Sequence, residues 1–292
     1  MLGAVPLRPR LLFALAGAAF FAWLGGDLST TALAHLGMDE LEREIGEEVA
    51  RSPGDPAGHL NAARVHEQKR EWDAALVELE VASERGADPD VVDTIRGRIF
   101  VAAGLPGRGK IEFDRVLVRR PDASGVLLER GRAWAKLGNA DEAAADMRRA
   151  IASLPRPTPE QVIELRDVLL AAGRREDAVR ALDAGMARVG RVASLQLAAV
   201  DLEVELHRYD DALRRIDELL AASPHDPSWV ARRGEILQRA GRTAQSRAEY
   251  ARALALIDAR PAGRRGKPFE ELRQRLATAL APAVAQSEGG RQ

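Results

Sequence analysis

The sequence predicts an all-α fold, a solenoid of about six helix–turn–helix pairs with a capping helix at each end. The first observation is a fixed period: small residues recur 34 positions apart, at Ala63, Gly97 and Gly131, and again at Val200 and Gly234. The second is that other residues keep fixed distances from these anchors. The third is that no stretch alternates polar and apolar residues as a β-strand does. Such a period is typical of stacked helix pairs, each packed on its neighbours.

The residues around each anchor follow one template. Arg166 takes the anchor position of the fourth repeat, one residue late, because the segment 156–159 lengthens the step from the third anchor to the fourth. Seven residues after four of the anchors comes a turn glycine, at Gly104, Gly138, Gly173 and Gly241. Twelve residues after each anchor comes a small residue, at Ala75, Gly109, Ala143, Ala178, Ala212 and Ser246. Sixteen residues after it comes a large apolar residue, at Leu79, Phe113, Met147, Leu182, Ile216 and Tyr250. We expect a small anchor where the two helices of a pair cross, since a larger side chain would hold their axes apart.

Residues 1–34 have the layout of a secretory signal peptide. Arg8 and Arg10 precede an apolar run over residues 11–24, and the segment ends in the A-x-A pattern of residues 32–34. The run of 14 residues is shorter than the roughly 20 that span a bilayer as a helix. We therefore expect a cleaved signal and a periplasmic or secreted chain that begins at His35. The alternative is an uncleaved segment anchored in the inner membrane, with the chain facing the periplasm.

The rest of the chain divides into a capping helix, six helix pairs and a second capping helix. Residues 35–55 predict the first cap, with Leu41, Ile45 and Val49 on one stripe. The repeats occupy residues 56–258, as pairs over 56–89, 90–123, 124–158, 159–192, 193–226 and 227–258. Their boundaries are marked by residues that cannot continue a helix, namely Pro89, Pro121, Pro155, Pro224 and Pro227. Residues 259–292 predict a basic loop, a capping helix and a disordered tail; the helix carries the apolar stripe Phe269, Leu272, Leu276 and Leu280.

The third repeat resembles a tetratricopeptide repeat (TPR). The positions that this family fills with large, small, aromatic, turn and proline residues are occupied by Leu127, Gly131, Trp134, Gly138, Ala143, Met147, Ala150 and Pro155. The resemblance covers residues 56–258 and implies a right-handed solenoid whose first helices line a concave groove. It also implies binding of a protein or peptide segment, without naming one. The family's carboxylate clamp pairs Lys and Asn at set positions, and because only Asn61 is near that scheme, that activity is not carried over.

Composition excludes several classes of function. The net charge of −1 provides no field that would attract nucleic acid or an anionic membrane. Aromatic residues make up only 4% of the chain, which leaves few platforms for stacked bases. The absence of cysteine excludes disulfides, thiolate metal sites and cysteine nucleophiles. All but four of the 43 basic residues are arginine, an excess that we attribute to codon usage or solubility.

Two local patterns suggest chemistry but are better explained by the repeats. Residues 104–110 match G-x-x-x-x-G-K of a phosphate-binding loop, but Ile111 stands where the loop needs a hydroxyl for Mg²⁺. The segment also falls on the turn of the second repeat, so a helix precedes it and not a strand. His59 and His66 are seven residues apart, two helical turns, which is too far to hold one metal ion comfortably. We therefore expect no catalytic residue, no cofactor site and no metal site.

A charged row follows the anchors by one residue. The six repeats carry Arg64, Arg98, Arg132, Asp167, Asp201 and Glu235 there. In the family that the chain resembles, this position lines the concave groove. Stacked repeats would give a groove that is basic along one half and acidic along the other, suited to an extended segment. An arginine fork donates two parallel hydrogen bonds to a carboxylate, which suits capture of acidic groups. The alternative is a solvated face without a ligand.

The sequence therefore favours a non-catalytic, protein- or peptide-binding scaffold of a bacterial type, acting in an exported complex through its concave groove. The expected partner is a protein or peptide segment and not a nucleic acid or a small-molecule substrate. A regulatory or enzyme-associated subunit with a cryptic site is one alternative, and it requires a convergent nucleophile, base and oxyanion donors. A helical-repeat RNA reader is the other, and it requires a basic groove rich in stacking residues.

Overall fold

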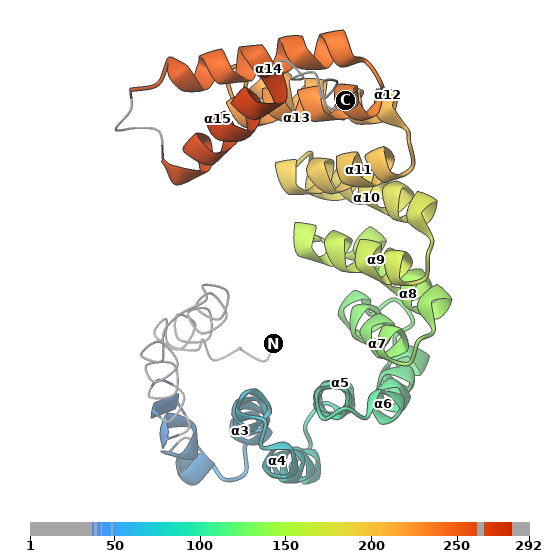
Figure 1. Cartoon of the computed structure of the whole chain (residues 1–292). Helices are drawn as coiled ribbons and strands as arrows, with labels where there is room; N and C mark the ends of the chain where they lie inside the picture. Colours follow the sequence, from blue (N-terminus) through green and yellow to red (C-terminus); the bar gives the residue numbers. More distant parts are fainter. Residues whose placement is uncertain (1–36, 38–39, 42, 48, 262–265, 282–292) are drawn as a thin grey trace, which may run out of the picture. The chain divides into compact units, whose positions relative to one another are not determined.

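The computed structural model describes residues 37, 40–41, 43–47, 49–261 and 266–281, and every regular element among them is helical. Figure 1 shows these helices following one another as antiparallel pairs. The all-α prediction is therefore confirmed. The chain divides into two compact units, residues 1–150 and residues 151–292, which are described separately below. The predicted signal segment, residues 1–34, lies outside the described residues.

The first unit contains repeats 1 to 3. In each repeat we call the first helix the A helix and the second the B helix. The helices are α3 (Pro56–Lys69), α4 (Trp72–Glu84), α5 (Pro89–Ala102), α6 (Pro106–Arg119), α7 (Ser124–Lys136) and α8 (Ala140–Ser153), the last of which ends in the second unit. Helix α3 packs on α4, α4 on α5, α5 on α6 and α6 on α7. Each repeat in this unit is thus in contact with the next one along the chain.

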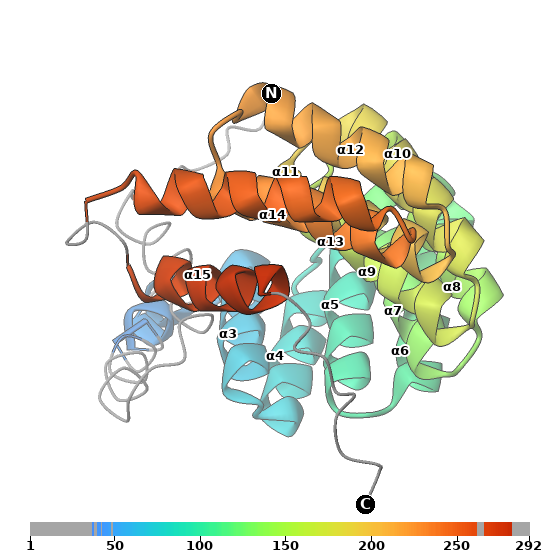
Figure 2. The same cartoon turned by 45° about the horizontal axis from the view of Figure 1, so that its top comes forward.

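The second unit contains repeats 4 to 6 and a final helix. Its helices are α9 (Pro159–Ala171), α10 (Arg175–Val189), α11 (Ala193–Glu205), α12 (Tyr209–Ala222), α13 (Pro227–Arg239), α14 (Thr243–Asp258) and α15 (Lys267–Leu280). Helix α10 packs on α9 and α11, α12 on α11 and α13, and α14 on α13 and α15. Figure 2 shows α15 running beside α14. The order of packing again follows the order of the chain, as expected of a repeat protein.

Four A helices begin with the same local signal, a capping side chain followed by proline. The pairs are Asp55–Pro56, Asp88–Pro89, Thr158–Pro159 and Asp226–Pro227. Each aspartate accepts a hydrogen bond from the backbone N–H two residues on, at 2.8–2.9 Å. Proline suits the first helical position because the N–H it lacks has no partner there. The predicted boundary placed Pro89 at the end of the first pair, but in the structure Pro89 begins the second pair.

The turn between the two helices of each repeat uses the left-handed backbone region. The residues there have φ between 58° and 81°, and they are Arg70, Gly104, Gly138, Gly173, His207 and Gly241. Glycine adopts this conformation without steric cost, whereas other L-residues do not. Repeats 1 and 5 thus make the same turn as the others with a residue that is less suited to it.

The anchors lie where the two helices of a repeat approach most closely. A Cβ atom added to Gly131 would lie 2.8 Å from Cγ of Met147, its partner sixteen residues on. One added to Gly97 would lie 2.5 Å from Cε1 of Phe113. Both distances are shorter than packed atoms tolerate, so the sequence prediction about the anchors agrees with the geometry of these repeats.

The fourth repeat solves the same problem from the other helix. Arg166 stands at its anchor, and its guanidinium turns to Asp167 at 2.6 Å. The close approach is made instead by Gly185 of α10, where an added Cβ would lie 2.6 Å from Cγ2 of Val162 in α9. A small residue on either helix is sufficient, because only the sum of the two side chains limits the approach.

Both predicted capping stripes cover apolar flanks. The described residues among 40–51 are helical, and Leu41 and Ile45 are buried against Val65 of α3. At the other end, Leu272 and Leu276 of α15 are buried in the core of repeats 5 and 6. Terminal repeats need such covers because a repeat at the end of a stack has no neighbour to bury its outer apolar face.

Candidate functional site

The three arginines of the charged row come together in the first unit. Arg64, Arg98 and Arg132 stand on the consecutive A helices α3, α5 and α7. Burial lowers the pKa of Arg64, and the positive charge of Arg98 lowers it further. Arg132 acts on Arg98 in the same direction. The three groups are thus electrostatic neighbours, and we call the surface that carries them the Arg face.

Arg98 is held by a carboxylate from the preceding repeat. Its Nε donates to Oε1 of Glu67 at 3.0 Å, and its Nη2 donates to Oε2 of the same group. This is the two-bond geometry in which arginine binds a carboxylate most strongly. Burial lowers the pKa of Arg98, but the hydrogen bond and charge of Glu67 outweigh it, so that the pKa is raised. The pair joins α3 to α5 across two repeats.

The other two arginines have partners on their own helices. Arg132 donates to Oε1 of Glu129 at 2.8 Å. Arg64 donates to Oδ1 of Asn61 at 3.1 Å, and among the described residues this neutral group is the hydrogen-bond acceptor found for its guanidinium. The Arg face therefore contains two compensated arginines and one whose charge has no ion-pair partner in the described part of the chain.

The acidic half of the row lies in the second unit and is also compensated. Asp167 pairs with Arg166. Asp201 and Glu235 share Arg232 of α13, whose Nη1 lies 2.8 Å from Oε2 of Glu235 and whose Nη2 donates to Asp201. The structure thus brings Asp201 and Glu235 together through Arg232. The sequence pattern, which considered only the residue after each anchor, did not predict this link.

A second set of charges, missed in the sequence, joins neighbouring repeats. Arg130 of α7 bridges Asp146 of α8 at 2.7 Å and Asp114 of α6 at 2.8 Å. Arg233 of α13 makes the equivalent bridge to Glu249 at 2.9 Å and Asp217 at 2.8 Å. Each of these arginines stands one residue before the anchor of its repeat. Its first partner, Asp146 or Glu249, stands fifteen residues after the same anchor. Its second partner, Asp114 or Asp217, directly follows the large apolar residue of the preceding repeat. The sequence carries a signal for these bridges, because the arginine and the two acids recur at the same positions of several repeats. Arg96, with Glu112 and Glu80, is a further example.

Repeat 5 builds a related bridge, with its arginine on the B helix instead of the A helix. Arg215 of α12 stands where other repeats carry the acid, and it contacts Asp183 of α10 and Glu203 of α11, each at 2.8 Å. The Glu203 side chain is only 3% exposed, and its Oε2 has no hydrogen-bond partner among the described residues. Burial raises the pKa of Glu203 despite the opposing effect of Arg215.

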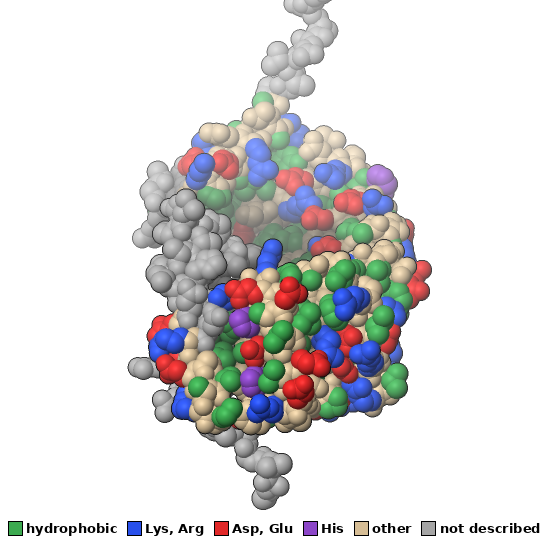
Figure 3. Space-filling view, turned by 90° about the horizontal axis from the view of Figure 1, so that it is seen from below, with side chains coloured by type: hydrophobic (Ala, Val, Ile, Leu, Met, Phe, Trp, Pro, Cys, Tyr) green, Lys and Arg blue, Asp and Glu red, His purple; other side chains and the backbone are tan. Residues whose placement is uncertain are grey.

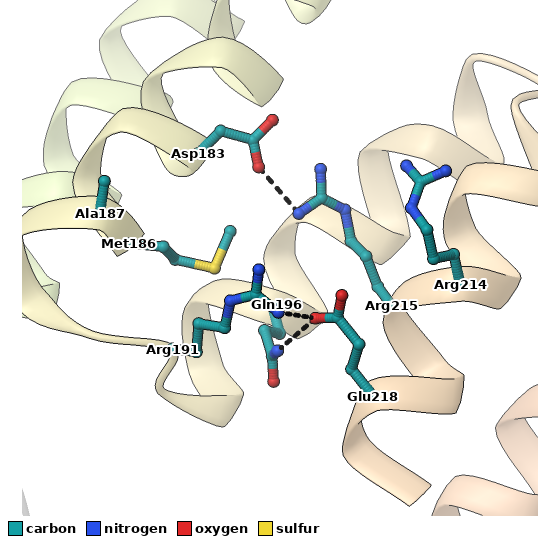
Figure 4. Close-up of a pocket in the computed structure, with 8 residues that line it drawn as sticks. All are labelled: Asp183, Met186, Ala187, Arg191, Gln196, Arg214, Arg215 and Glu218. Atoms are coloured by element: carbon teal, nitrogen blue, oxygen red, sulfur yellow. Dashed lines mark hydrogen bonds and ion pairs between the residues drawn. The ribbon is translucent and has the colours of Figure 1, made fainter. Parts of the chain in front are cut away.

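A pocket of about 360 Å³ opens beside this bridge, among α10, α11 and α12. Figure 4 shows Arg215 directed to Asp183, and Arg191 and Gln196 directed to Glu218. Its lining residues are Asp183, Met186, Ala187, Arg191, Gln196, Arg214, Arg215 and Glu218. Two of its three arginines pair with lining carboxylates, Arg215 with Asp183 and Arg191 with Glu218, and Arg214 pairs with Asp211 outside the lining.

The phosphate-loop-like segment and two of the histidines are part of the helical framework. Gly104 forms the turn after helix α5, and Lys110 lies inside α6 with its Nζ 2.6 Å from Asp114. His59 contacts Glu78 at 2.7 Å, and His66 contacts Glu71 at 2.6 Å. Within the described ranges, no group of three or more His, Cys, Asp or Glu residues is placed to hold a metal ion.

The outer surface of the first unit carries scattered apolar side chains. On the face seen in Figure 3, basic, acidic and hydrophobic side chains are interspersed. The large hydrophobic residues that are exposed in the described part of the chain all belong to this unit; they are Val77, Leu105, Ile111, Val118 and Leu137. Among the helices that are described, none is both long and apolar enough to span a membrane.

The family model for the tetratricopeptide repeat matches residues 96–156 and 197–263. These two stretches take in most of repeats 2 and 3 and of repeats 5 and 6. They leave out repeats 1 and 4. No curated protein sequence matches the chain.

Solved structures with the same architecture are numerous. The C-terminal part of a TPR repeat-containing protein from Cytophaga hutchinsonii superposes with a TM-score of 0.60 at 12% identity, over 84% of this chain and 95% of that one. PilW, described as a type IV pilus biogenesis factor, superposes with a TM-score of 0.51 at 18% identity, over 75% of this chain and 96% of its own. At such identities the likeness shows the fold.

Proposed function

Because two stretches of the chain match the tetratricopeptide repeat family model, we propose that it is a non-catalytic scaffold that binds a protein or peptide segment on the A-helix side of its repeats. Solenoids of this kind present extended surfaces to partners. The observation that carries the proposal is the Arg face, where Arg64, Arg98 and Arg132 follow one another on three consecutive A helices.

The chemistry of the Arg face favours an acidic, extended segment. Guanidinium groups bind carboxylates through two parallel hydrogen bonds, and Arg98 already makes this contact with Glu67. A segment with carboxylates along its length can meet successive repeats in turn. Since the side chains are part-exposed, binding would be modest and would weaken as salt is added.

The proposed setting is an exported complex of a bacterial envelope, in the periplasm or outside the cell. Its support is the sequence of residues 1–34 alone, with basic residues, an apolar run and an A-x-A end. Fractionation of cells that express the tagged full chain measures this directly. Recovery of the chain in the cytoplasm at full length would contradict the proposed location and leave the proposed binding intact.

Binding is tested with a fluorescent glutamate-rich peptide and anisotropy at low ionic strength. The expected result is saturable binding by the wild-type chain that is lost in the Arg64→Ala/Arg98→Ala/Arg132→Ala variant, with an unchanged helical circular dichroism spectrum. The matched control is Arg108→Ala/Arg115→Ala/Arg148→Ala, which removes three exposed arginines from the B helices α6 and α8. Equal binding by wild type and the first variant would refute the role of the Arg face.

A further inference from the structure

We propose that Glu67 acts as a resident ligand of the Arg face, so that a partner gains the two-bond edge of Arg98, formed by Nε and Nη2, only by displacing Glu67. The inference rests on the proposed function and deepens it: Arg64 takes the first carboxylate of an acidic segment, and Glu67, while charged, holds back the contact of a second carboxylate with Arg98. A segment with a single carboxylate engages Arg64 and leaves the resident pair in place.

The geometry of the Glu67–Arg98 pair is that of a bound acidic ligand. Two hydrogen bonds join the carboxylate to Nε and Nη2 of the guanidinium. Glu67 lies in helix α3 of repeat 1, whereas Arg98 lies in helix α5 of repeat 2. It therefore approaches the guanidinium from a neighbouring chain segment, as the carboxylate of a partner would.

The exposure of the two side chains differs. Glu67 is 14% exposed, whereas Arg98 is 37% exposed. The arginine is thus within reach of a molecule in solution while its carboxylate partner sits deeper. Replacement of Glu67 by a carboxylate of the partner exchanges one ion pair for another, so Arg98 adds little net affinity as long as Glu67 is charged.

Arg64 contrasts with Arg98 on the same surface. It is exposed, and its hydrogen bond goes to the neutral oxygen of Asn61. Partial desolvation and the charge of Arg98 lower its pKa, with the charge of Glu67 opposing them. A carboxylate that pairs with Arg64 relieves the repulsion between the two arginines and displaces no negative group. Arg64 is therefore the first contact of an acidic segment. A second contact, with Arg98, requires the free energy of breaking the Glu67–Arg98 pair.

The test compares Glu67→Gln with wild type, using capped synthetic peptides that carry one glutamate or two adjacent glutamates in an otherwise identical Gly/Ser background. Glutamine keeps the length of the side chain and removes its charge. We expect the two-glutamate peptide to bind the variant about three- to tenfold more tightly than wild type, the range for release of one part-exposed pair. The one-glutamate peptide should gain less than twofold.

The matched control is Glu80→Gln, which removes an exposed negative charge from the B helix α4 of the same unit. It should bind both peptides as wild type does. An equal gain in Glu80→Gln, or no gain in Glu67→Gln while the triple arginine variant loses binding, would overturn the inference and leave the proposed function standing. Undiminished binding by the triple arginine variant would instead overturn the proposed function.

Discussion

Repeats 3 and 5 each place one arginine between two carboxylates, but the arginine comes from opposite helices. In repeat 3, in the first unit, Arg130 of the A helix reaches Asp146 and Asp114. In repeat 5, in the second unit, Arg215 of the B helix reaches Glu203 and Asp183. Both bridges join a repeat to the one before it. Only the position fifteen residues after the anchor changes sign, from Asp146 to Arg215, while Asp183 keeps the acid of Asp114. A bridge is nevertheless present in both repeats.

The two bridges differ in how well their buried carboxylate is satisfied. Asp146 receives two hydrogen bonds from Arg130, at 2.7 and 2.9 Å. Glu203 is the most buried carboxylate of its bridge, and one of its oxygens is left without a partner in the described structure. A buried charge stabilises a fold only when its lone pairs are satisfied. Repeat 5 thus carries a bridge of lower quality than repeat 3.

The largest effect is expected from removal of either arginine. Arg130→Ala and Arg215→Ala each leave a buried carboxylate without its partner, so each should lower the free energy of unfolding by about 3 kcal/mol. Chemical denaturation followed by circular dichroism measures both. A loss below about 1 kcal/mol for Arg215→Ala alone would show that repeat 5 does not depend on its bridge, and the comparison would fail.

The helix crossing of repeat 3 is the next most sensitive point. Gly131→Leu should destabilise the chain by about 1–3 kcal/mol, because the added side chain meets Met147. Gly125→Ala on the same helix α7 has open space around it, and it should stabilise by about 0.5–1 kcal/mol through helix propensity. Equal unfolding midpoints for Gly131→Leu and wild type would contradict the close approach of α7 and α8.

Neutralising the two buried carboxylates should give effects of opposite sign. Asp146→Asn weakens two charge-assisted hydrogen bonds and should cost about 2 kcal/mol. Glu203→Gln removes a charge that burial already disfavours, and it should stabilise the chain by about 1 kcal/mol near pH 7.5. Thermal unfolding of both variants beside wild type reads out the sign.

The pH dependence of Glu203→Gln provides the control. Since the folded state raises the pKa of Glu203, folding favours its protonated form. The stability that this group contributes is present at low pH and is lost as the pH rises through the folded pKa. The advantage of the glutamine variant should therefore be largest above that pKa and shrink as the pH falls toward the ordinary glutamate range. A pH-independent difference would mean that burial of the charge is not its cause.

The smallest effect concerns the turns of the same two repeats. His207 in repeat 5 has φ of 58°, where repeat 3 has Gly138 at 81°. His207→Gly should stabilise by about 0.5–1 kcal/mol, because glycine relieves the strain of the left-handed region. Gly138→Ala should destabilise by about 1 kcal/mol for the same reason. A destabilised His207→Gly would indicate that its contact to the Tyr209 hydroxyl, at 2.8 Å, outweighs the strain.

The overabundance of arginine has a structural use that composition concealed. Beyond the bridges, arginines late in the B helices donate to backbone carbonyls of the segment before their own repeat: Arg149 to Pro121, Arg188 to Leu154 and Arg252 to Pro224. These carbonyls follow helix ends, where the backbone has no intrahelical donor. Codon usage or solubility, the interpretation from composition, is therefore an incomplete account of these residues.

The sequence by itself determined the period, the helix pairs, the turns and the small residues at the crossings. These features depend on local conformation and on contacts at fixed spacing, which recur in every repeat and so stand out in one chain. Gly131 and Gly138 are examples, since each is explained by its position in its own repeat.

Only the tertiary structure decided which charges pair between repeats. Glu67 meets Arg98 from 31 positions away, and Arg232 meets Asp201 from the same distance. The side chains are long and flexible, and each charged position has several possible partners on neighbouring helices. The choice among them depends on interhelix distances and burial, which no single repeat encodes. The row of charges was thus visible in the sequence, and so were the pairs Glu129–Arg132 and Arg232–Glu235, which lie three residues apart on one helix. Its contacts between repeats, Glu67 with Arg98 and Arg232 with Asp201, became apparent only when the helices were packed together.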